Sequence, residues 1–173
     1  RLTKIVAAEG EFNEEDLISN EQTVVALTHF GYIKRMPVDT YKSQRRGGKG
    51  ITGISTREED FVKQIFTAST HDTILFFSNK GKLYRLRGFE IPEAGRTAKG
   101  TAIVNLLSLE AGEKISAVIP ITNFEDGKYL LMATKKGLIK KTSLKEYDST
   151  RKTGLLAINL KEDDELIEVR LTD

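Results

Sequence analysis

The sequence has 173 residues, of which 39% are hydrophobic and 30% are charged, proportions typical of one folded domain of good size. It contains no cysteine, which excludes disulfides and thiolate metal sites and favours a reducing compartment. Because no apolar run approaches the ~18 residues that a membrane span needs, we expect a cytoplasmic protein with no membrane partner.

The net charge is only +2, but the cations are unevenly distributed along the chain. Residues 1–23 hold two cations and six anions. Six cations lie in residues 31–50, six in residues 80–100 and seven in residues 135–154, with one or two anions in each block. Basic charge is therefore concentrated in three blocks spaced by about 50 residues, a spacing that indicates a repeat.

The first repeat follows a segment, 1–21, that we expect to be a tail entering the domain. TVVALTH (23–29) precedes a glycine turn, the run YIKRM and a long polar loop. GITGI (50–54), an acidic turn at 57–60 and FVKQIFTAS (61–69) complete the unit. Each run is rich in Val, Ile, Leu, Phe or Tyr and is bounded by Gly, Asn or Asp, which predicts short β-strands.

Two further repeats follow the same order, and three sets of matching segments define the register. Gly31, Gly81 and Gly137 lie in HFGYIKR (29–35), NKGKLYR (79–85) and KKGLIKK (135–141). The second set is KGITGI (49–54), KGTAIV (99–104) and TGLLAI (153–158). The third is FVKQIFTAST (61–70), ISAVIPITN (115–123) and LIEVRLTD (166–173). We predict repeats at about 22–70, 71–123 and 124–173.

Four-stranded units of 40–50 residues are typical of propeller blades. We therefore predict an all-β, propeller-like fold of about three four-stranded blades. A β-sandwich of about a dozen strands is the alternative, but it does not account for the repeat. Three blades do not close a propeller, so the unit is expected either to be part of a larger ring or to pair with another copy.

No segment has the pattern of a catalytic site. The loop QRRGGKG (44–50) lacks the Ser or Thr that a P-loop needs after its lysine, and a strand-like run follows it. His29 and His71 lie beside predicted turns without a partner for catalysis or metal binding. The acidic clusters 58–60 and 163–165 occupy equivalent turns and are interpreted as solvated turns, because calcium-loop spacing is absent.

The basic blocks recur at one phase of the repeat, so a ring of blades places them in one belt. Such a belt can follow a phosphate backbone, with backbone N–H groups and bidentate arginines as donors. The loop 44–50 has no aromatic residue on which bases could stack, which favours duplex DNA over single strands.

The heptapeptide QRRGGKG resembles, at all seven positions, the signature of the C-terminal domain of the DNA gyrase A chain, which belongs to the type IIA topoisomerases. VVALTHFGYIKRMPVDTY (24–41), THDTILFFSNKGKLY (70–84), MATKKGLIKKTSL (132–144) and DDELIEVRLT (163–172) are similar to that domain in the same order. The resemblance implies a β-pinwheel, a ring of usually six blades that exchange strands with their neighbours; this chain would be half of it.

The resemblance also implies a function. Such a domain wraps duplex DNA on a basic rim, without sequence preference, for ATP-dependent negative supercoiling. The cleaving tyrosine and the ATPase lie elsewhere in an assembly of two A and two B subunits. This chain itself is expected to be non-catalytic and to bind no ATP, magnesium or other cofactor. The alternatives are the equivalent domain of the topoisomerase IV A chain, a protein-interaction scaffold and a nucleotide enzyme.

The predicted DNA contacts fall into two groups. The principal group is the heptapeptide, in which we expect Arg45, Arg46 and Lys49 to bind phosphate beside Gln44, Gly47, Gly48 and Gly50. The second group is the rim cations Lys34, Arg35, Lys82, Arg85, Arg96, Lys99, Lys140, Lys141, Arg151 and Lys152.

Overall fold

The computed structural model describes residues 14–41, 59–148 and 154–173. The heptapeptide 44–50 lies outside these residues, as do Arg151 and Lys152. Their roles remain predictions from the sequence.

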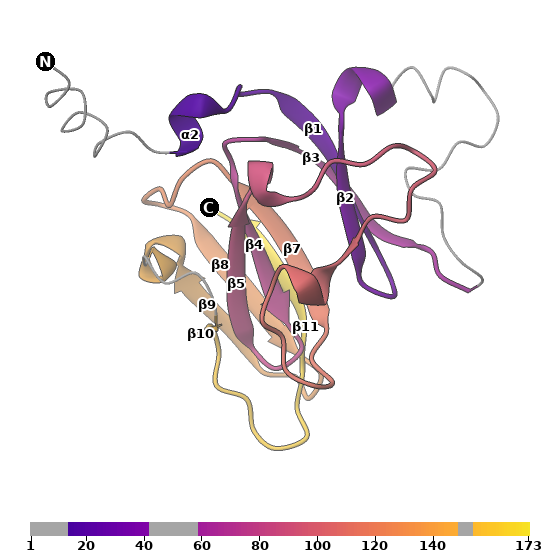
Figure 1. The fold of residues 1–173 in the computed structure, drawn as a ribbon. Helices are drawn as coiled ribbons and strands as arrows, with labels where there is room; N and C mark the ends of the chain where they lie inside the picture. Colours follow the sequence, from indigo (N-terminus) through magenta and orange to yellow (C-terminus); the bar gives the residue numbers. More distant parts are fainter. Residues whose placement is uncertain (1–13, 42–58, 149–153) are drawn as a thin grey trace, which may run out of the picture.

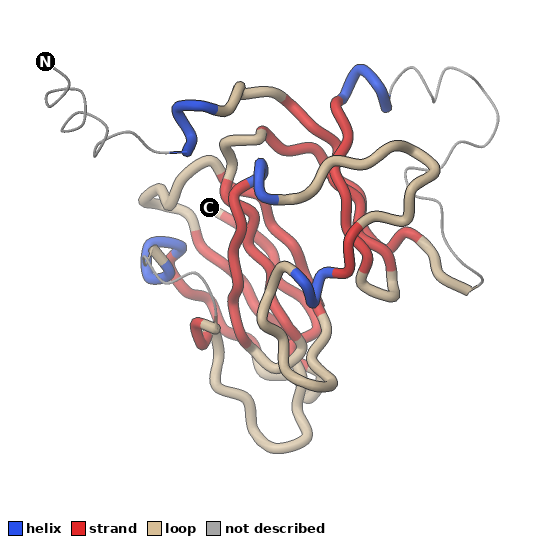
Figure 2. The backbone as a smooth tube through the Cα atoms, viewed as in Figure 1, coloured by secondary structure: helices blue, strands red, loops and turns tan. Residues whose placement is uncertain are grey.

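Three antiparallel sheets make up the fold, as the tubes of Figure 2 show. The first sheet has the order β3 (Val62–Ser69), β1 (Gln22–Thr28), β2 (Tyr32–Pro37), β6 (Thr101–Ala102). The second has the order β10 (Leu155–Leu156), β5 (Lys82–Arg87), β4 (Thr73–Ser78), β7 (Ile115–Ile121). The third has the order β11 (Leu166–Thr172), β8 (Tyr129–Thr134), β9 (Ile139–Ser143). The all-β, bladed prediction is confirmed; within the described ranges the third sheet has three strands and the other two have four.

Short helical turns flank these strands. They are α2 (Glu14–Leu17), a helical turn at 38–41 after β2, η1 (Gly88–Glu90), η2 (Ile103–Asn105) and η3 (Leu144–Tyr147). The acidic helix α2 precedes the first strand and is held against the second sheet. Glu15 accepts from the Arg87 guanidinium at 2.8 Å, and His71 Nε2 lies 2.8 Å from the carbonyl of Ile18. The Arg87 hydrogen bond is the main reason that the pKa of Glu15 is lowered.

The first two sheets are each completed by a strand from the next repeat. β6 pairs with β2, opposing Thr101 to Ile33, and β10 pairs with β5, opposing Leu155 to Leu83. These two strands come from the second set of matching segments in the sequence. The blades therefore exchange strands with their neighbours.

The three matching glycines form three equivalent turns. Gly31, Gly81 and Gly137 have φ angles of 94°, 81° and 95°, in the left-handed region that a side chain disfavours. Their N–H groups donate to the carbonyls of Thr28, Ser78 and Thr134, each at 3.0 Å. The shared geometry explains why the glycine is the most regular feature of the repeat.

The core lies in two layers, one on each face of the second sheet. Ile74 and Phe76 of β4 pack toward the first sheet with Val25, Leu27 and Ile33. On its other face, Leu75 and Phe77 pack with Leu130, Met132 and Leu166 of the third sheet. All four β4 side chains are fully buried, each contributing about 1.5–3 kcal/mol by the transfer of apolar surface from water. The continuous apolar run ILFF is therefore the central strand of the molecule (Figure 1).

One end of every sheet meets its neighbours, and the other end faces outward. β3, β7 and β11 are the inner strands, joined by side chains that cross between sheets. Lys63 and Gln64 donate to the carbonyls of Ile115 and Val118, at 2.8 and 3.0 Å, and Ser116 donates to that of Leu166 at 2.8 Å. We call β2, β5 and β9, near the opposite ends of the sheets, the outer strands (Figure 1).

One predicted solvated turn is partly buried. Asp60 is only 8% exposed, and its Oδ1 accepts the N–H groups of Phe30 and Phe61, both at 2.9 Å. It ties the Gly31 turn to the start of β3. Asp164 lies in the equivalent turn of the third repeat and accepts from Lys136 and Glu165 at 2.9 Å, but at the surface.

Candidate nucleic-acid interface

The described rim cations lie on the outer strands or on the loop that runs from the second sheet to β6, the strand that completes the first sheet. Lys34 and Arg35 are on β2, Lys82 and Arg85 on β5, and Lys140 and Lys141 on β9. Arg96 and Lys99 lie in the loop between η1 and β6. The structure thus brings cations of all three repeats to the outward-facing ends of the sheets.

In the first sheet, both β2 cations bind the protein itself. Lys34 is fully buried, and its Nζ donates to three backbone carbonyls. Arg35 donates from Nε to the carbonyl of Ile91 at 2.6 Å and lies 4.0 Å from the carboxylate of Glu93. In these positions the two side chains support the loop beside them.

That loop carries the cations that the first sheet presents to solvent. Arg96 is exposed. Lys99 is half-buried, because its Nζ lies 4.4 Å from the centre of the Tyr32 ring. Such a cation–π contact restricts the lysine without neutralising it.

The second sheet presents a paired lysine and a stacked arginine. Lys82 is hydrogen-bonded to Glu110, which also lies 3.4 Å from Lys80. This pairing raises the pKa of Lys82 and lowers that of Glu110. The Arg85 guanidinium lies over the Phe124 ring at 5.3 Å; burial lowers its pKa, but a guanidinium stays charged at neutral pH.

The third sheet has the most exposed pair. Lys140 and Lys141 are both exposed on β9. Lys140 Nζ donates to the carbonyl of Ala157 at 3.3 Å, and Lys141 Nζ lies 4.7 Å from the centre of the Tyr129 ring. These side chains reach solvent beside the strand exchanged between the second and third repeats.

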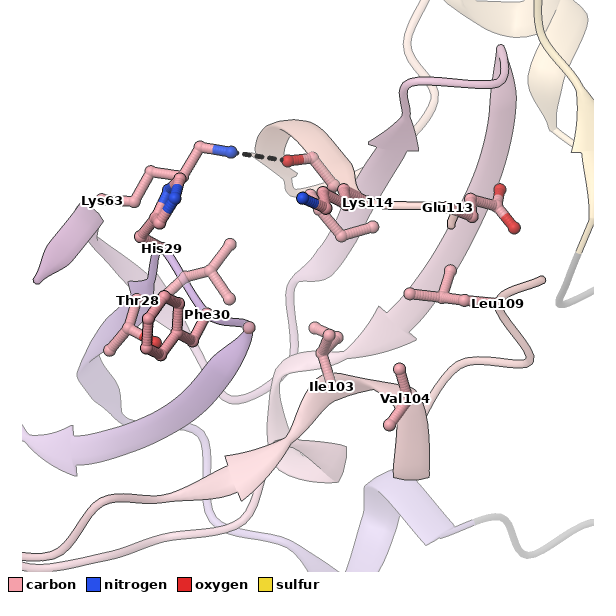
Figure 3. A pocket seen from close by; sticks show the side chains of 12 residues that line it. Thr28, His29, Phe30, Lys63, Ile103, Val104, Leu109, Glu113 and Lys114 are labelled. Atoms are coloured by element: carbon pink, nitrogen blue, oxygen red, sulfur yellow. Dashed lines mark hydrogen bonds between the residues drawn. The ribbon is translucent and has the colours of Figure 1, made fainter. Parts of the chain in front are cut away.

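A pocket of about 280 Å³ opens elsewhere, between the Gly31 turn, η2 and the start of β7 (Figure 3). Its walls are mainly apolar, and two lysines that the sequence patterns did not single out, Lys63 and Lys114, also line it. Burial first, and the nearby Lys114 second, lower the pKa of Lys63. The lining residues are Leu27, Thr28, His29, Phe30, Gly31, Lys63, Ile103, Val104, Leu109, Glu113, Lys114 and Ile115.

The described residues lack two other kinds of functional feature. Among them, no three His, Cys, Asp or Glu residues come together in a way that could hold a metal ion. No helix in the described ranges is long and apolar enough to cross a membrane.

Three blades, of which the first two are each completed by a strand from the next repeat, carry cations along their outer strands and define a propeller-like protein of the β-pinwheel class. A family model described as DNA gyrase C-terminal domain, beta-propeller, matches residues 22–69, 72–122 and 128–173. The chain belongs to the DNA gyrase C-terminal domain family, and the resemblance inferred from the sequence is confirmed.

Individual relatives agree with this assignment. The DNA gyrase A chain of Clostridium acetobutylicum is 56% identical over 172 residues, which cover 99% of this chain and 21% of that protein. Its counterpart in Halalkalibacterium halodurans is 56% identical over 173 residues, covering 100% and 21%. This chain thus spans about a fifth of the length of the curated relatives it matches.

Solved structures share the fold. The C-terminal domain of DNA topoisomerase IV superposes with a TM-score of 0.77 at 32% identity, covering 90% of this chain and 47% of that one. The DNA gyrase A C-terminal domain gives a TM-score of 0.63 at 25% identity, covering 88% and 48%.

Proposed function

We propose that this chain is a non-catalytic module that binds and wraps duplex DNA as part of a DNA gyrase A chain. The observation that carries the proposal is the placement of exposed or half-buried cations at the outward-facing ends of all three sheets, on loop 92–100, β5 and β9. Membership of the gyrase C-terminal domain family supports it.

A basic surface can offset the free energy that bending DNA costs. Bending 20–30 base pairs smoothly by 40–90° costs about 1–6 kcal/mol, and phosphate contacts must offset that cost whatever the sequence. Lysine and arginine contacts with phosphate are sequence-independent. Arg96, Lys140 and Lys141 are exposed for this role, Lys99 is half-buried beside Tyr32, and the sequence adds the three cations of 44–50.

The partners of the module follow from the same proposal. The chain acts in the cytoplasm within a gyrase assembly that contains two A and two B subunits. ATP and magnesium act elsewhere in that assembly. The wrapped DNA is presented in one orientation to the cleavage gate, so that strand passage introduces negative supercoils.

DNA binding by the 173-residue chain tests the proposal. If ~6–10 phosphates are neutralised, the affinity for duplex DNA falls about 10³–10⁵-fold between 50 and 200 mM salt. The affinity is expected to be the same for unrelated sequences and unaffected by ATP and magnesium. A flat salt response, with tight binding of an acidic protein instead, would indicate an interaction scaffold.

The similarity to the topoisomerase IV C-terminal domain favours one second candidate, the decatenating paralogue. The intact heptapeptide in the sequence argues for gyrase. The two are separated by replacing the corresponding domain of a gyrase A chain with one that carries this sequence. Restored negative supercoiling supports gyrase, whereas decatenation without supercoiling supports the paralogue.

A further inference from the structure

Loop 92–100 is attached to the outer strand β2 at both of its ends. At its start, Arg35 N–H donates to the carbonyl of Pro92 at 3.1 Å, and Ala94 N–H donates to the carbonyl of Arg35 at 3.2 Å. At its end, Thr101 of β6 pairs with Ile33. The loop therefore leaves β2 at one residue and returns two residues away, as an Ω-loop does.

The loop cannot fill its own interior, because between Pro92 and Gly100 the sequence EAGRTAK has no large apolar side chain. The side chain of Lys34, from the strand between the two attachment points, does so instead. It has no exposed surface. A lysine this buried has to satisfy its ammonium group with protein acceptors.

Three carbonyls of the loop provide those acceptors. Lys34 Nζ donates to the carbonyls of Gly95, Arg96 and Ala98, at 2.5, 3.0 and 3.1 Å. An ammonium group has three N–H donors, so donors and acceptors match in number. Burial lowers the pKa of Lys34 to about 8, which leaves the group mostly protonated at neutral pH.

The consequence is a loop whose carbonyls turn inward while Gly95, Arg96 and Thr97 lie exposed at its tip. We propose that Lys34 is a positioning residue: it shapes loop 92–100 from within so that Arg96 and Lys99 bind the phosphodiester backbone of a duplex. This inference rests on the proposed function. It makes the lysine of the first repeat a support of the DNA contact and not itself a contact.

The other two repeats use the equivalent position differently. Tyr84, three residues after its turn glycine as Lys34 is, directs its hydroxyl to the buried carboxylate of Glu113. Lys140, the third equivalent, is exposed and donates to one carbonyl, that of Ala157. Among the three repeats, a loop whose interior is occupied by a lysine side chain is therefore described only at the first outer strand, β2.

The first experiment measures the loop without DNA. Lys34→Met keeps the apolar stem and removes the donors, and Lys161→Met is the matched control, because Lys161 is exposed and the charge change is the same. Leaving the carbonyls without donors is expected to speed amide hydrogen exchange of residues 94–99 about tenfold or more. The control and the remaining strands are expected to keep wild-type exchange. Unchanged exchange of the loop in a folded Lys34→Met chain overturns the inference.

The second experiment separates positioning from direct contact. Arg96→Ala with Lys99→Ala is expected to weaken duplex binding about tenfold, and adding Lys34→Met to that pair is expected to change nothing further, since coupled residues are not additive. A direct phosphate contact of Lys34 would instead lower the slope of log affinity against log salt by about 0.9 more, which contradicts the inference.

A third measurement uses the unaltered chain, so it holds even if Lys34→Met does not fold. Amine acetylation followed by mass spectrometry is expected to label the exposed Lys140 and Lys141 in the free chain and to label them less when duplex DNA is bound. Lys34 is expected to stay unlabelled with and without DNA. Labelling of free Lys34 together with its protection by DNA overturns the positioning role. One outcome separates the two proposals. If Lys34→Met speeds the exchange of residues 94–99 but the wild-type chain binds no duplex at low salt, Lys34 does shape the loop. The proposed function and the role of the loop in DNA binding are then both refuted.

Discussion

The outer strands of the first and second sheets place different chemistry at the same position of the repeat. Lys34 and Tyr84 each lie three residues after a left-handed turn glycine, and both are almost fully buried. The face of β5 that carries Tyr84 packs against the first sheet. Among the described residues, the equivalent face of β2 packs against a loop, not a sheet. The position is therefore buried in both repeats, and the residue type differs with the structure that covers it: a lysine where a loop offers carbonyl acceptors, and a tyrosine where the neighbouring sheet is apolar.

The largest expected effect comes from the loops that follow the outer strands, which also differ between the repeats. Loop 44–50 carries three cations, whereas 93–100 and 147–154 carry two each. Replacing residues 44–50 with alanines in a complete gyrase is expected to abolish DNA wrapping and negative supercoiling, because it removes the densest charge and the glycines.

Cleavage and ATP-independent relaxation are expected to persist in that variant, measured on plasmid DNA. Arg151→Ala with Lys152→Ala is the milder control. A normal supercoiling rate would show that the heptapeptide is only a linker. An unfolded domain would instead show that it closes a ring.

The glycines that precede the two exchanged strands offer a sharper contrast. Gly100 and Gly154 both have left-handed φ angles, 97° and 71°. A Cβ on Gly100 would meet the Ile33 carbonyl oxygen at 2.6 Å, but on Gly154 it would meet none of the described residues within 4 Å. Gly154→Ala is expected to cost about 1–2 kcal/mol of unfolding free energy. Gly100→Ala is expected to cost about 1–3 kcal/mol more, from overpacking. Equal shifts of the urea midpoint would contradict the close approach of β6 to β2.

Removing one hydroxyl tests the partner of Tyr84. Its hydroxyl lies 2.9 Å from both carboxylate oxygens of Glu113, which is 6% exposed. Tyr84→Phe leaves that carboxylate with the Glu110 N–H, at 2.8 Å, as its remaining described donor. We expect a loss of about 1–3 kcal/mol in unfolding free energy. Tyr32→Phe, on a half-buried ring, is the control and is expected to change stability little.

The buried pair Lys34 and Tyr84 is also expected to give two opposite pH trends. Burial lowers the pKa of Lys34 from 10.5 to about 8, so between these values the unfolded chain binds more protons and this residue makes stability rise with pH. Burial raises the pKa of Tyr84 above 10.0, so the folded chain keeps a proton that the unfolded chain loses, and stability falls above about pH 10. Urea unfolding from about pH 7 to 11 is expected to lose the first trend in Lys34→Met and the second in Tyr84→Phe. Parallel curves for all three proteins would contradict both assignments.

The sequence was sufficient to predict the repeat, the strands and the family. Gly31, Gly81 and Gly137 determine the turns locally, since φ > 0 strongly favours a residue without a Cβ. Continuous apolar runs, VVAL (24–27), ILFF (74–77) and LLMA (130–133), mark a strand that lies inside each sheet. These are local signals, and each appears three times.

What could not be predicted depends on contacts between distant segments. From the sequence, Lys34 is predicted to be a surface cation, but loop 92–100, about 60 residues later, covers it in the structure. Asp60 is predicted to be a solvated acid, but it accepts a hydrogen bond from the Phe30 amide. One signal was available: Gly100 directly before an exchanged strand indicates a backbone that approaches its neighbour closely.

Strand exchange also sets the order in which the molecule can be assembled during synthesis. The outer strand β2 meets its partner β6, and β5 meets β10, about 70 residues further along the chain. Pairing over such separations carries a large loop-closure cost and is slow. While the second repeat is still inside the ribosome, the edge of β2 has no β6 to pair with, and an open edge is a site of misassembly. The first two blades therefore mature only after the next repeat has been translated, and until then the open edges of β2 and β5 are sites of misassembly.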